Sequence, residues 1–456
     1  MDSLSGIISH QHNLSDLIEE INSFFQRSCI FLTDTLTFGK RYTITGKLRS
    51  NATEVLYALV DGEQCCLKRW LPCHDELYKT EDNTRNIQYI LKGFDFNSAM
   101  AKSVYLGVAR IKREEEDSFI LGRIISKPSY KNLDSRYEYV LVMKRLKEKW
   151  RLDHYLLSEN LVESEEFIKF LATSIAHIHA ELPLISAKED HDRLPYTSAG
   201  TYLSALQEKL AKNLKLFRRA MTERIHSVIV EQEPSLPGYY QNLEENMYKM
   251  LKLYRELFER RYANGHVKRC HGDLKALNLW IRPAQTEVEE KELLLLDCVD
   301  FEPTFYYIDT LSDIAMLVAD LHAYLLHMIP DRADKYLSLF LTTYLTQAGE
   351  THLEDLEPLL EYFITEKAMV CAYMWVLYDQ QRASKEQLEI GKYYFQVAER
   401  HAKKLQLYTT SRRTNYIHTS RLRGKKQQKR ASKRKQCAEA SGRVASLHKS
   451  SQLVKV

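Results

Sequence analysis

The pattern of hydrophobic residues changes once along this chain, close to residue 147, and that change limits the fold more than any other feature. Between residues 41 and 146, short runs rich in Val, Ile, Leu and Tyr are separated by turns, and Asp61-Gly62 is typical of a tight β-hairpin. One helical stretch, Thr84–Met100, interrupts them. Beyond this point apolar residues recur with helical spacing, first over Glu163–Leu182 and last over Thr310–His401. We therefore expect an α+β fold, with a small antiparallel β lobe followed by a larger helical lobe.

The domain boundaries that we predict follow from these patterns and from charge. Residues 1–38 contain one amphipathic run and are expected to form an N-terminal helical extension, followed by the β-rich lobe (39–146) and the helical lobe (147–408). The last 46 residues contain 14 Lys and Arg and one acidic residue, whereas the rest of the chain carries 51 basic and 60 acidic residues. We expect residues 409–456 to be a basic, disordered tail, able to make a weak contact with nucleic acid or another polyanion.

The cysteines and the apolar segments indicate the cellular compartment in which the protein is expected. The eight cysteines form no CxxC pair, which favours a reducing compartment. The N-terminus lacks the basic start and the continuous apolar core of a signal peptide. The most apolar later stretch, Ile314–Ile329, contains Asp320 and is too short to span a bilayer. We expect a soluble, cytoplasmic protein without membrane contact.

One short segment in the helical half has the pattern of a phosphoryl-transfer site. The sequence HGDLKALN (residues 271–278) places Asp273 five residues before Asn278. In kinases such a loop uses the Asp to accept the proton of the substrate hydroxyl and the Asn to bind magnesium. Four leucines then lead into Asp297, and a carboxylate at the end of a buried strand suits a further magnesium ligand. We predict Asp273, Asn278 and Asp297 as the catalytic set, with Asn278 and Asp297 as the metal ligands.

Polar residues near this set have more ordinary interpretations. His271 is expected to orient the loop by hydrogen bonding rather than to transfer protons. Asp300 is either a second acidic contact or part of a turn at the strand end. Asp309 and Asp313 flank the start of a helix, where capping is the better interpretation.

Taken together, these segments resemble the aminoglycoside phosphotransferase family. In that family HGDLHxxN precedes an I/F-D motif and a D-x-x-x-DLA helix, and this chain has HGDLKALN, LLLLDCVDF and YIDTLSDIAMLVADL. The resemblance is closest to an uncharacterised bacterial branch whose kinase domain is often fused to a P-loop ATPase, on the segments YLGV (105–108), VMKR (142–145) and RCHGDL (269–274). No GxxxxGK[ST] occurs, so no fused ATPase is expected within this sequence. The resemblance covers roughly residues 40–400 and implies a bilobal protein-kinase-like fold.

The resemblance also assigns residues of the β-rich lobe to nucleotide binding. Thr45–Thr53 is similar to the nucleotide-covering loop of the family, although it holds one glycine, and this similarity implicates Gly46, Ser50 and Asn51 in cradling phosphates. Lys68 matches the lysine that pairs with the α- and β-phosphates of ATP.

Two points depart from the family pattern. The usual partner of Lys68 is a glutamate on the following helix, and the candidates, Glu76 and Glu81, both lie before the expected helix. Lys275 stands where the family usually has His. Protein kinases carry Lys there, which implies a contact with the γ-phosphate; a solvated side chain is the alternative.

The resemblance implies a kinase of the aminoglycoside and choline type, an ATP- and Mg²⁺-dependent phosphotransferase that acts on a hydroxyl of a small molecule. Residues 39–146 would then be the nucleotide-binding lobe and residues 147–408 the catalytic and substrate lobe. The alternative is a catalytically weak kinase-like binding module whose basic tail binds nucleic acid or another polyanion. The single glycine of the covering loop and the missing glutamate favour that alternative, whereas the intact set of Asp273, Asn278 and Asp297 opposes it.

Overall fold

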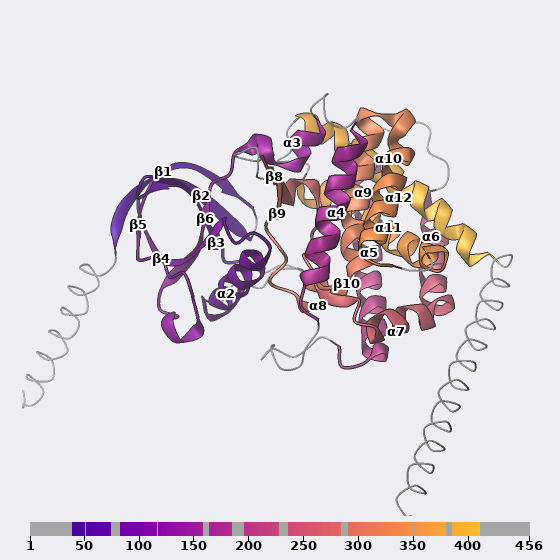
Figure 1. The fold of residues 1–456 in the computed structure, drawn as a ribbon, viewed down its shortest axis with the longest axis horizontal. Coiled ribbons are helices and arrows are strands. Elements are labelled where there is room, and N and C mark those ends of the chain that lie inside the picture. The colour runs from indigo at the N-terminus through magenta and orange to yellow at the C-terminus, as the bar shows by residue number, and fades with distance from the viewer. Residues whose placement is uncertain are drawn as a thin grey trace, which may run out of the picture. The chain divides into compact units, whose positions relative to one another are not determined.

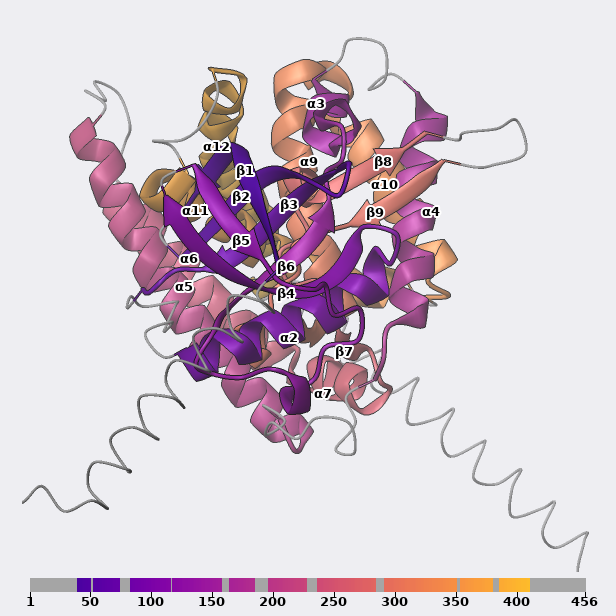
Figure 2. The same ribbon diagram turned by 90° about the vertical axis from the view of Figure 1, so that its left-hand side faces the viewer.

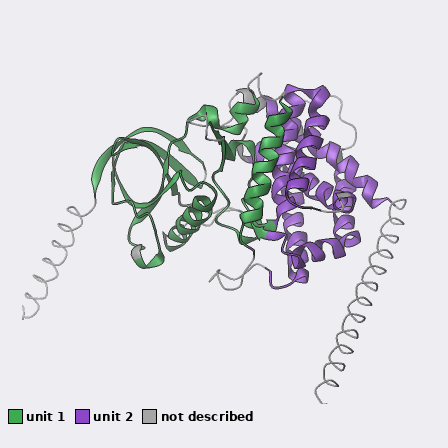
Figure 3. Cartoon of the chain, in the orientation of Figure 1, with its two compact units in different colours: residues 1–183, 268–308 green, residues 184–267, 309–456 purple. Residues whose placement is uncertain are grey.

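The computed structural model describes residues 39–50, 52–73, 83–115, 117–157, 164–184, 196–227, 236–283, 291–350, 353–379 and 385–410. The predicted N-terminal extension (1–38) and the predicted basic tail beyond residue 410 lie outside this part of the chain. The chain forms two compact units, Met1–Pro183 with Lys268–Ile308 and Leu184–Val267 with Asp309–Val456 (Figure 3). The predicted boundary after residue 146 therefore falls inside unit 1, which holds both the β-rich segment and the HGDLKALN loop.

Unit 1 consists of a six-stranded barrel, a β-hairpin and several helices (Figure 1). The barrel strands are β1 (Lys40–Arg49), β2 (Thr53–Val60), β3 (Glu63–Trp70), β4 (Tyr105–Glu115), β5 (Ser118–Leu121) and β6 (Glu138–Lys144). The hairpin is formed by β8 (Leu279–Arg282) and β9 (Glu292–Leu295). The helices are α2 (Asn83–Met100), α3 (Leu152–Leu156), α4 (Glu165–Glu181) and α8 (Pro303–Tyr306), with 3₁₀ turns η1 (Tyr130–Asn132), η2 (Glu148–Trp150) and η3 (Ala276–Asn278). The short strands β7 (Val267–Arg269) and β10 (Tyr307–Asp309) lie where the chain passes from one unit to the other.

The antiparallel strands close into a barrel, where the sequence analysis expected only a small sheet. The strand order is β1-β2-β3-β6-β4-β5, and β1 pairs with both β2 and β5. The first part of β1, up to Thr43, pairs with β5, and the part from Ile44 onward pairs with β2. A bulge between Ile44 and Gly46 marks the change of partner. Because a bulge bends its strand and increases the twist, one long strand can serve both edges and close the barrel.

The predicted hairpin at Asp61-Gly62 is confirmed. Both residues have positive φ, 51° and 89°, and the flanking residues Val60 and Glu63 are paired. Positive φ at both central positions is the geometry of the two-residue turn that matches the twist of antiparallel strands.

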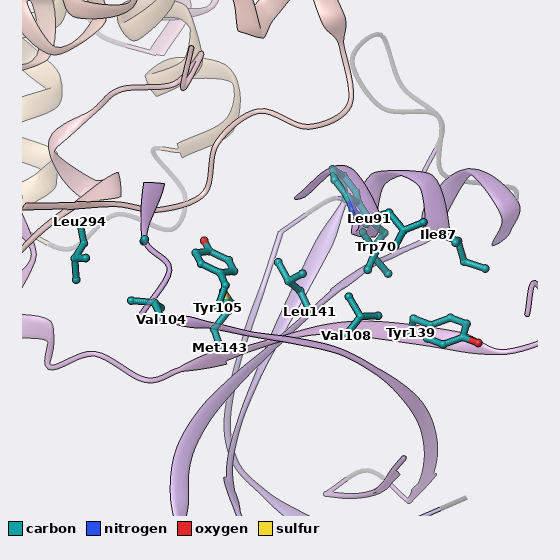
Figure 4. Packing of buried hydrophobic residues seen from close by; sticks show 13 residues of the cluster. Trp70, Ile87, Leu91, Val104, Tyr105, Val108, Tyr139, Leu141, Met143 and Leu294 are labelled. Carbon is teal, nitrogen blue, oxygen red and sulfur yellow. The ribbon is translucent and has the colours of Figure 1, made fainter. Parts of the chain in front are cut away.

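Two hydrophobic clusters organise unit 1. The first fills the barrel and includes Leu56, Leu67, Phe119 and Val142, all of which are fully buried. The second joins helix α2 to the barrel and to strand β9 of the hairpin (Figures 2 and 4). Its members include Trp70, Ile87, Ile90, Leu91, Val104, Tyr105, Leu141, Met143 and Leu294. Apolar packing thus fixes α2 between the strand that carries Lys68 and the hairpin that leads to Asp297.

Unit 2 is helical. Its helices are α5 (Ala199–Ser227), α6 (Leu236–Leu253), α7 (Arg255–Ala263), α9 (Thr310–Met328), α10 (Ala333–Gln347), α11 (Leu353–Met374) and α12 (Lys385–Thr409), with the short η4 (Pro330–Arg332) and η5 (Trp375–Asp379). Helix α9 is buried from Thr310 to Leu325 and packs against α10, α11 and α12. The predicted cap is confirmed, because the Asp309 side chain accepts a hydrogen bond from the Leu311 N–H. Helices α6 and α7 are separated at Tyr254.

The predicted mixture of strands and helices is therefore confirmed. Within the described part of the chain, no helix combines the length and the apolar character that crossing a bilayer requires.

Strand β2 offers a matched pair of leucines for testing the barrel core. Leu56 is fully buried and Leu59 is 54% exposed. We expect Leu56→Ala to lower the free energy of unfolding by about 2–5 kcal/mol, because it removes buried methyl groups and leaves a cavity. Leu59→Ala should change it by less than about 0.5 kcal/mol. Urea denaturation of both variants tests this, and equal effects would contradict the orientation of β2.

Candidate active site

The β8–β9 hairpin brings Asn278 and Asp297 to the same end of one structural element. Leu279 pairs with Leu295, so Asn278 precedes the first strand and Asp297 follows the second at the open end of the hairpin. The Leu296 N–H donates to the Asn278 carbonyl at 2.9 Å and extends the ladder past the last strand pair. Two residues that are 19 positions apart in sequence are therefore placed by ordinary antiparallel pairing.

Hydrogen bonds of His271 connect the HGDLKALN loop to the turn after β9. Its ring nitrogen Nε2 lies 2.9 Å from the Leu296 carbonyl, and Nδ1 accepts a hydrogen bond from the Asp273 N–H at 3.2 Å. The Nε2–H tautomer follows, because Nδ1 is the acceptor. The His271 carbonyl also accepts from the Val299 N–H at 2.9 Å. The predicted orienting hydrogen bonds of His271 are therefore present.

Gly272 allows the backbone to turn immediately before Asp273. Its φ is +84°, and a Cβ built there would lie 2.7 Å from the Phe305 carbonyl oxygen and 3.1 Å from Val299 side-chain atoms. Any other residue would combine an unfavourable φ with a collision, so the glycine of the motif is required by the local geometry.

Asp273, Asn278 and Lys275 form one contact group. The Asn278 amide nitrogen donates to the Asp273 carbonyl at 2.8 Å and to its carboxylate oxygen Oδ2 at 3.2 Å. The other carboxylate oxygen, Oδ1, lies 3.1 Å from the Lys275 ammonium. The Lys275 side chain is 10% exposed, so it is not the solvated lysine of the alternative interpretation. The Asp273 side chain is one-third exposed and remains accessible.

Asp297 has a left-handed backbone, with φ at 64°. Among residues other than glycine, Asp and Asn adopt this conformation most readily. Its carboxylate accepts a hydrogen bond from the Lys68 ammonium, and its side chain is 56% exposed. Desolvation tends to raise the pKa of this carboxyl, but the Lys68 charge, with smaller contributions from His271 and Lys275, holds the pKa below its usual value.

Two residues that the sequence analysis did not assign hold the Asp297 turn in place. The Tyr105 hydroxyl accepts from the Asp297 N–H at 3.2 Å and donates to Asn97 Oδ1 at 3.0 Å. The same Asn97 oxygen accepts from the Cys298 N–H at 3.0 Å, and the Asn97 amide nitrogen donates to the Gly93 carbonyl at 2.7 Å. Asn97 is 2% exposed. An Asn in the last turn of the expected helix was the one available signal.

Lys68 projects from β3, whose residue 68 pairs with Leu141 of β6. Its side chain is 17% exposed and lies over the Trp70 ring, 5.8 Å from the centroid. Burial tends to lower the pKa of Lys68, but the carboxylates of Asp297 and then Asp300 outweigh it and raise the pKa above its usual value. The predicted glutamate candidates, Glu76 and Glu81, lie outside the described residues.

Asp300 is a second carboxylate in the segment after β9. It is 6% exposed, and burial raises its pKa to about 7, with Asp297 reinforcing the rise and Lys68 opposing it. Its position in the fold is set by Gly93 of α2, because a Cβ on Gly93 would lie 2.5 Å from Asp300 Oδ2. Both interpretations of Asp300 that the sequence left open, an acidic contact and a turn at the strand end, stay predictions.

The expected nucleotide-covering loop is mostly strand. Strand β1 continues to Arg49, so Gly46 lies inside it, opposite Tyr57. The connection to β2 is a tight turn in which the Ser50 N–H donates to the Thr53 carbonyl at 2.8 Å and the Ser50 hydroxyl accepts from the Thr53 N–H at 2.9 Å. Asn51 lies outside the described residues. The first half of the expected loop is therefore part of strand β1, where it pairs with β2.

The oxygen atoms at the open end of the hairpin suit magnesium. Asp297 offers a partly exposed carboxylate, and Asn278 has an amide oxygen left as a ligand because its nitrogen donates to Asp273. Magnesium in phosphoryl-transfer sites is held by one or two protein oxygens, with water and phosphate completing its shell. In the described segments no group of three or more His, Cys, Asp or Glu side chains could hold a metal by itself. The donor set therefore fits an ion that is shared with bound phosphate.

Comparison with known proteins returned structural matches only. No protein-family model and no curated protein sequence matches the chain. Among solved structures, an ethanolamine kinase of Plasmodium vivax is 13% identical, with a TM-score of 0.39 over 79% of this chain and 81% of the kinase. A thermostable mutant of aminoglycoside phosphotransferase APH(4)-Ia, in complex with ADP and hygromycin B, is 8% identical, with a TM-score of 0.36 over 79% and 94% of the two chains. A glucosamine kinase is 14% identical, with a TM-score of 0.38 over 81% and 76%.

These structural neighbours include the family that the sequence motifs resemble. At such identities and TM-scores, what the chain does has to be argued from the residues of the site itself.

The hydrogen bonds by which Asn97 and Tyr105 hold the Asp297 turn can be tested by measuring stability. We expect Asn97→Ala to lower the free energy of unfolding by about 1–3 kcal/mol, because it leaves the Cys298 N–H and the Tyr105 hydroxyl without their buried acceptor. The neighbouring Ser98→Ala loses a single exposed hydrogen bond to a carbonyl and should have a much smaller effect. Urea denaturation measures both. If Asn97→Ala lowers the free energy of unfolding no more than Ser98→Ala does, these hydrogen bonds do not stabilise the fold.

Proposed function

We propose that this chain is an ATP- and magnesium-dependent kinase that phosphorylates a hydroxyl group of a small molecule. The observation that carries the proposal is the hydrogen-bonded hairpin end, where Asp273 contacts Asn278 and Asp297 contacts Lys68. A base, two oxygen ligands and a phosphate-binding cation are the parts that phosphoryl transfer needs. The bilobal arrangement, with residues 39–146 as the nucleotide lobe and 147–408 as the catalytic and substrate lobe, belongs to the same proposal.

Asp273 is the base in this scheme. Its carboxylate would accept the proton of the acceptor hydroxyl and align that oxygen with the γ-phosphorus of ATP. The bond from Asn278 restrains the side chain, and Lys275, which pairs with the carboxylate at 3.1 Å, would contact the transferred phosphoryl group. Lys275 therefore links the base to the γ-phosphate rather than serving as a surface residue.

Lys68 would bind the α- and β-phosphates, and Asn278 and Asp297 would hold the magnesium ion. The ion, when bound, bridges phosphate oxygens and offsets the charge that develops during transfer. Gly46, inside β1, and Ser50 and Asn51 of the β1–β2 connection stay assigned to the phosphates on the strength of the resemblance.

The role of Asp273 can be tested once an acceptor is found by measuring ATP consumption against a library of hydroxylated metabolites. We expect Asp273→Asn to lower turnover by about two to four orders of magnitude, the range for loss of a general base, with ATP affinity nearly unchanged. Asp117→Asn, in the exposed turn between β4 and β5, is the matched control. Normal turnover of Asp273→Asn with the true acceptor would remove this residue as the base.

The metal site makes a separate prediction that needs no acceptor. Asp297→Ala should abolish the magnesium-dependent part of ATP binding, because no neutral side chain there replaces a charged oxygen ligand. Isothermal titration of ATP with magnesium and with EDTA measures that part directly, with Asp117→Ala as the control. Unchanged ATP affinity in excess magnesium would exclude Asp297 from the metal site and count against the kinase.

A further inference from the structure

The proposed mechanism does not use two buried histidines of unit 2. His322 lies on helix α9 and is 0% exposed, and His401 lies on helix α12 and is 1% exposed. The His322 nitrogen Nδ1 and the His401 nitrogen Nε2 are 3.0 Å apart, and the two rings meet edge to face. Because imidazole changes its charge near neutral pH, a buried pair of this kind is a candidate for a pH-sensitive contact.

Each ring of this pair also faces a carboxylate. The His401 nitrogen Nδ1 is hydrogen-bonded to Glu361 Oε1 of helix α11. The His322 nitrogen Nε2 lies 3.8 Å from Asp334 Oδ1 of helix α10, which is beyond hydrogen-bonding distance. Asp334 is paired instead with Arg400 of α12 at 2.9 Å. The pair thus lies where α9, α11 and α12 pack against one another, with α10 beside them (Figure 1).

The contact between the two rings has room for one hydrogen. A hydrogen bond between two imidazole nitrogens needs an N–H on one side and a lone pair on the other. Of the four ring nitrogens, at most three can therefore carry hydrogen while the contact lasts, so the pair can hold at most one positive charge. Two charged rings would direct N–H groups at each other across 3.0 Å. Once the rings are separated, each can take up its own proton.

The surroundings of His322 oppose a positive charge on its ring. Burial lowers the pKa of His322 to about 3, and positive charges on helix α12 reinforce the shift. Asp334 acts in the opposite direction, but it is largely exposed and already paired with Arg400. The charged and titratable groups of the described residues that face the pair are Asp334 from α10, Glu361 from α11, and Arg400 and Lys404 from α12.

We propose that the His322–His401 pair is a pH-sensitive contact that holds helix α12 on α9 and α11 at neutral pH and releases it on acidification. The packed pair binds fewer protons than the two separated rings, so acid favours the released state. The stabilisation is fully present above about pH 6.5, the ordinary pKa of imidazole, and is lost progressively below it. This inference concerns unit 2 alone and does not depend on the proposed kinase function.

Amide hydrogen exchange of the full chain, followed by mass spectrometry, tests the contact, because exchange within a helix reports its opening. After correction for the intrinsic exchange rate, we expect Lys385–Thr409 to open about tenfold more often at pH 5.5 than at pH 7.5, the ratio for one imidazole protonated on release. Asp and Glu side chains of ordinary pKa remain ionised over this range. Helix α2 contains no histidine and should show no such change.

His322→Asn removes the titrating ring and leaves an amide that can still bond to His401. We expect the dependence of α12 opening on pH to shrink from about tenfold to less than about threefold. The ratio between the two pH values is unaffected by a constant loss of stability, so a less stable variant still gives an answer. His327→Asn is the matched control, because His327 lies on the same helix and packs against Tyr393 of α12, with ring centroids 5.7 Å apart, but is only half-buried. It should keep the tenfold dependence of the parent.

Three results would overturn the inference. The first is that opening of α12 in the parent chain changes with pH no more than opening of α2. The second is that His322→Asn keeps the full dependence on pH. The third is that His327→Asn loses the dependence to the same extent as His322→Asn. None of these results bears on magnesium-dependent ATP binding by Asp297→Ala, so the kinase proposal stands or fails separately.

Discussion

The candidate site depends on the hydrogen bonds that hold Asp297 in a left-handed conformation. On one side, Tyr105 and Asn97 bind the backbone N–H groups of Asp297 and Cys298. On the other side, His271 binds the residues that flank the same turn. Backbone conformations of this kind persist only where the surrounding structure fixes them, and they concentrate at functional sites. The orientation of the Asp297 carboxylate therefore depends on three elements: the barrel, helix α2 and the HGDLKALN loop.

Features that depend on neighbouring residues in the sequence were predictable. The turn at Asp61-Gly62 needs only two residues that tolerate positive φ, and the cap at Asp309 needs only a carboxylate at a helix start. The hairpin that brings Asn278 and Asp297 together was also predictable, because an apolar strand on each side of a polar turn favours antiparallel pairing. Even the orienting role of His271 follows from its place beside the loop.

Features that depend on distant contacts were not predictable. Barrel closure requires that β1 meet β5, about 80 residues later along the chain, and no local pattern encodes that meeting. The hydrogen bonds that hold the Asp297 turn join Tyr105 and Asn97 to residues about 200 positions away. The family resemblance places the partner of Lys68 on the following helix, whereas the Lys68 ammonium donates to Asp297 and the helix presents Gly93 to Asp300. A glycine on a helix gives no sign, in sequence, of which side chain it admits.

The connection of helix α2 to the Asp297 turn has a mechanical consequence. In protein kinases, the glutamate that pairs with the phosphate-binding lysine lies on a helix that can move. The position of that helix therefore controls whether the lysine is correctly placed. Here the Lys68 ammonium donates instead to Asp297, on the segment that follows strand β9. Helix α2 is in turn tied to that segment by Asn97 and by the cluster that includes Leu294. A displacement of α2 would therefore break the hydrogen bond from the Cys298 N–H to Asn97 that holds the Asp297 turn.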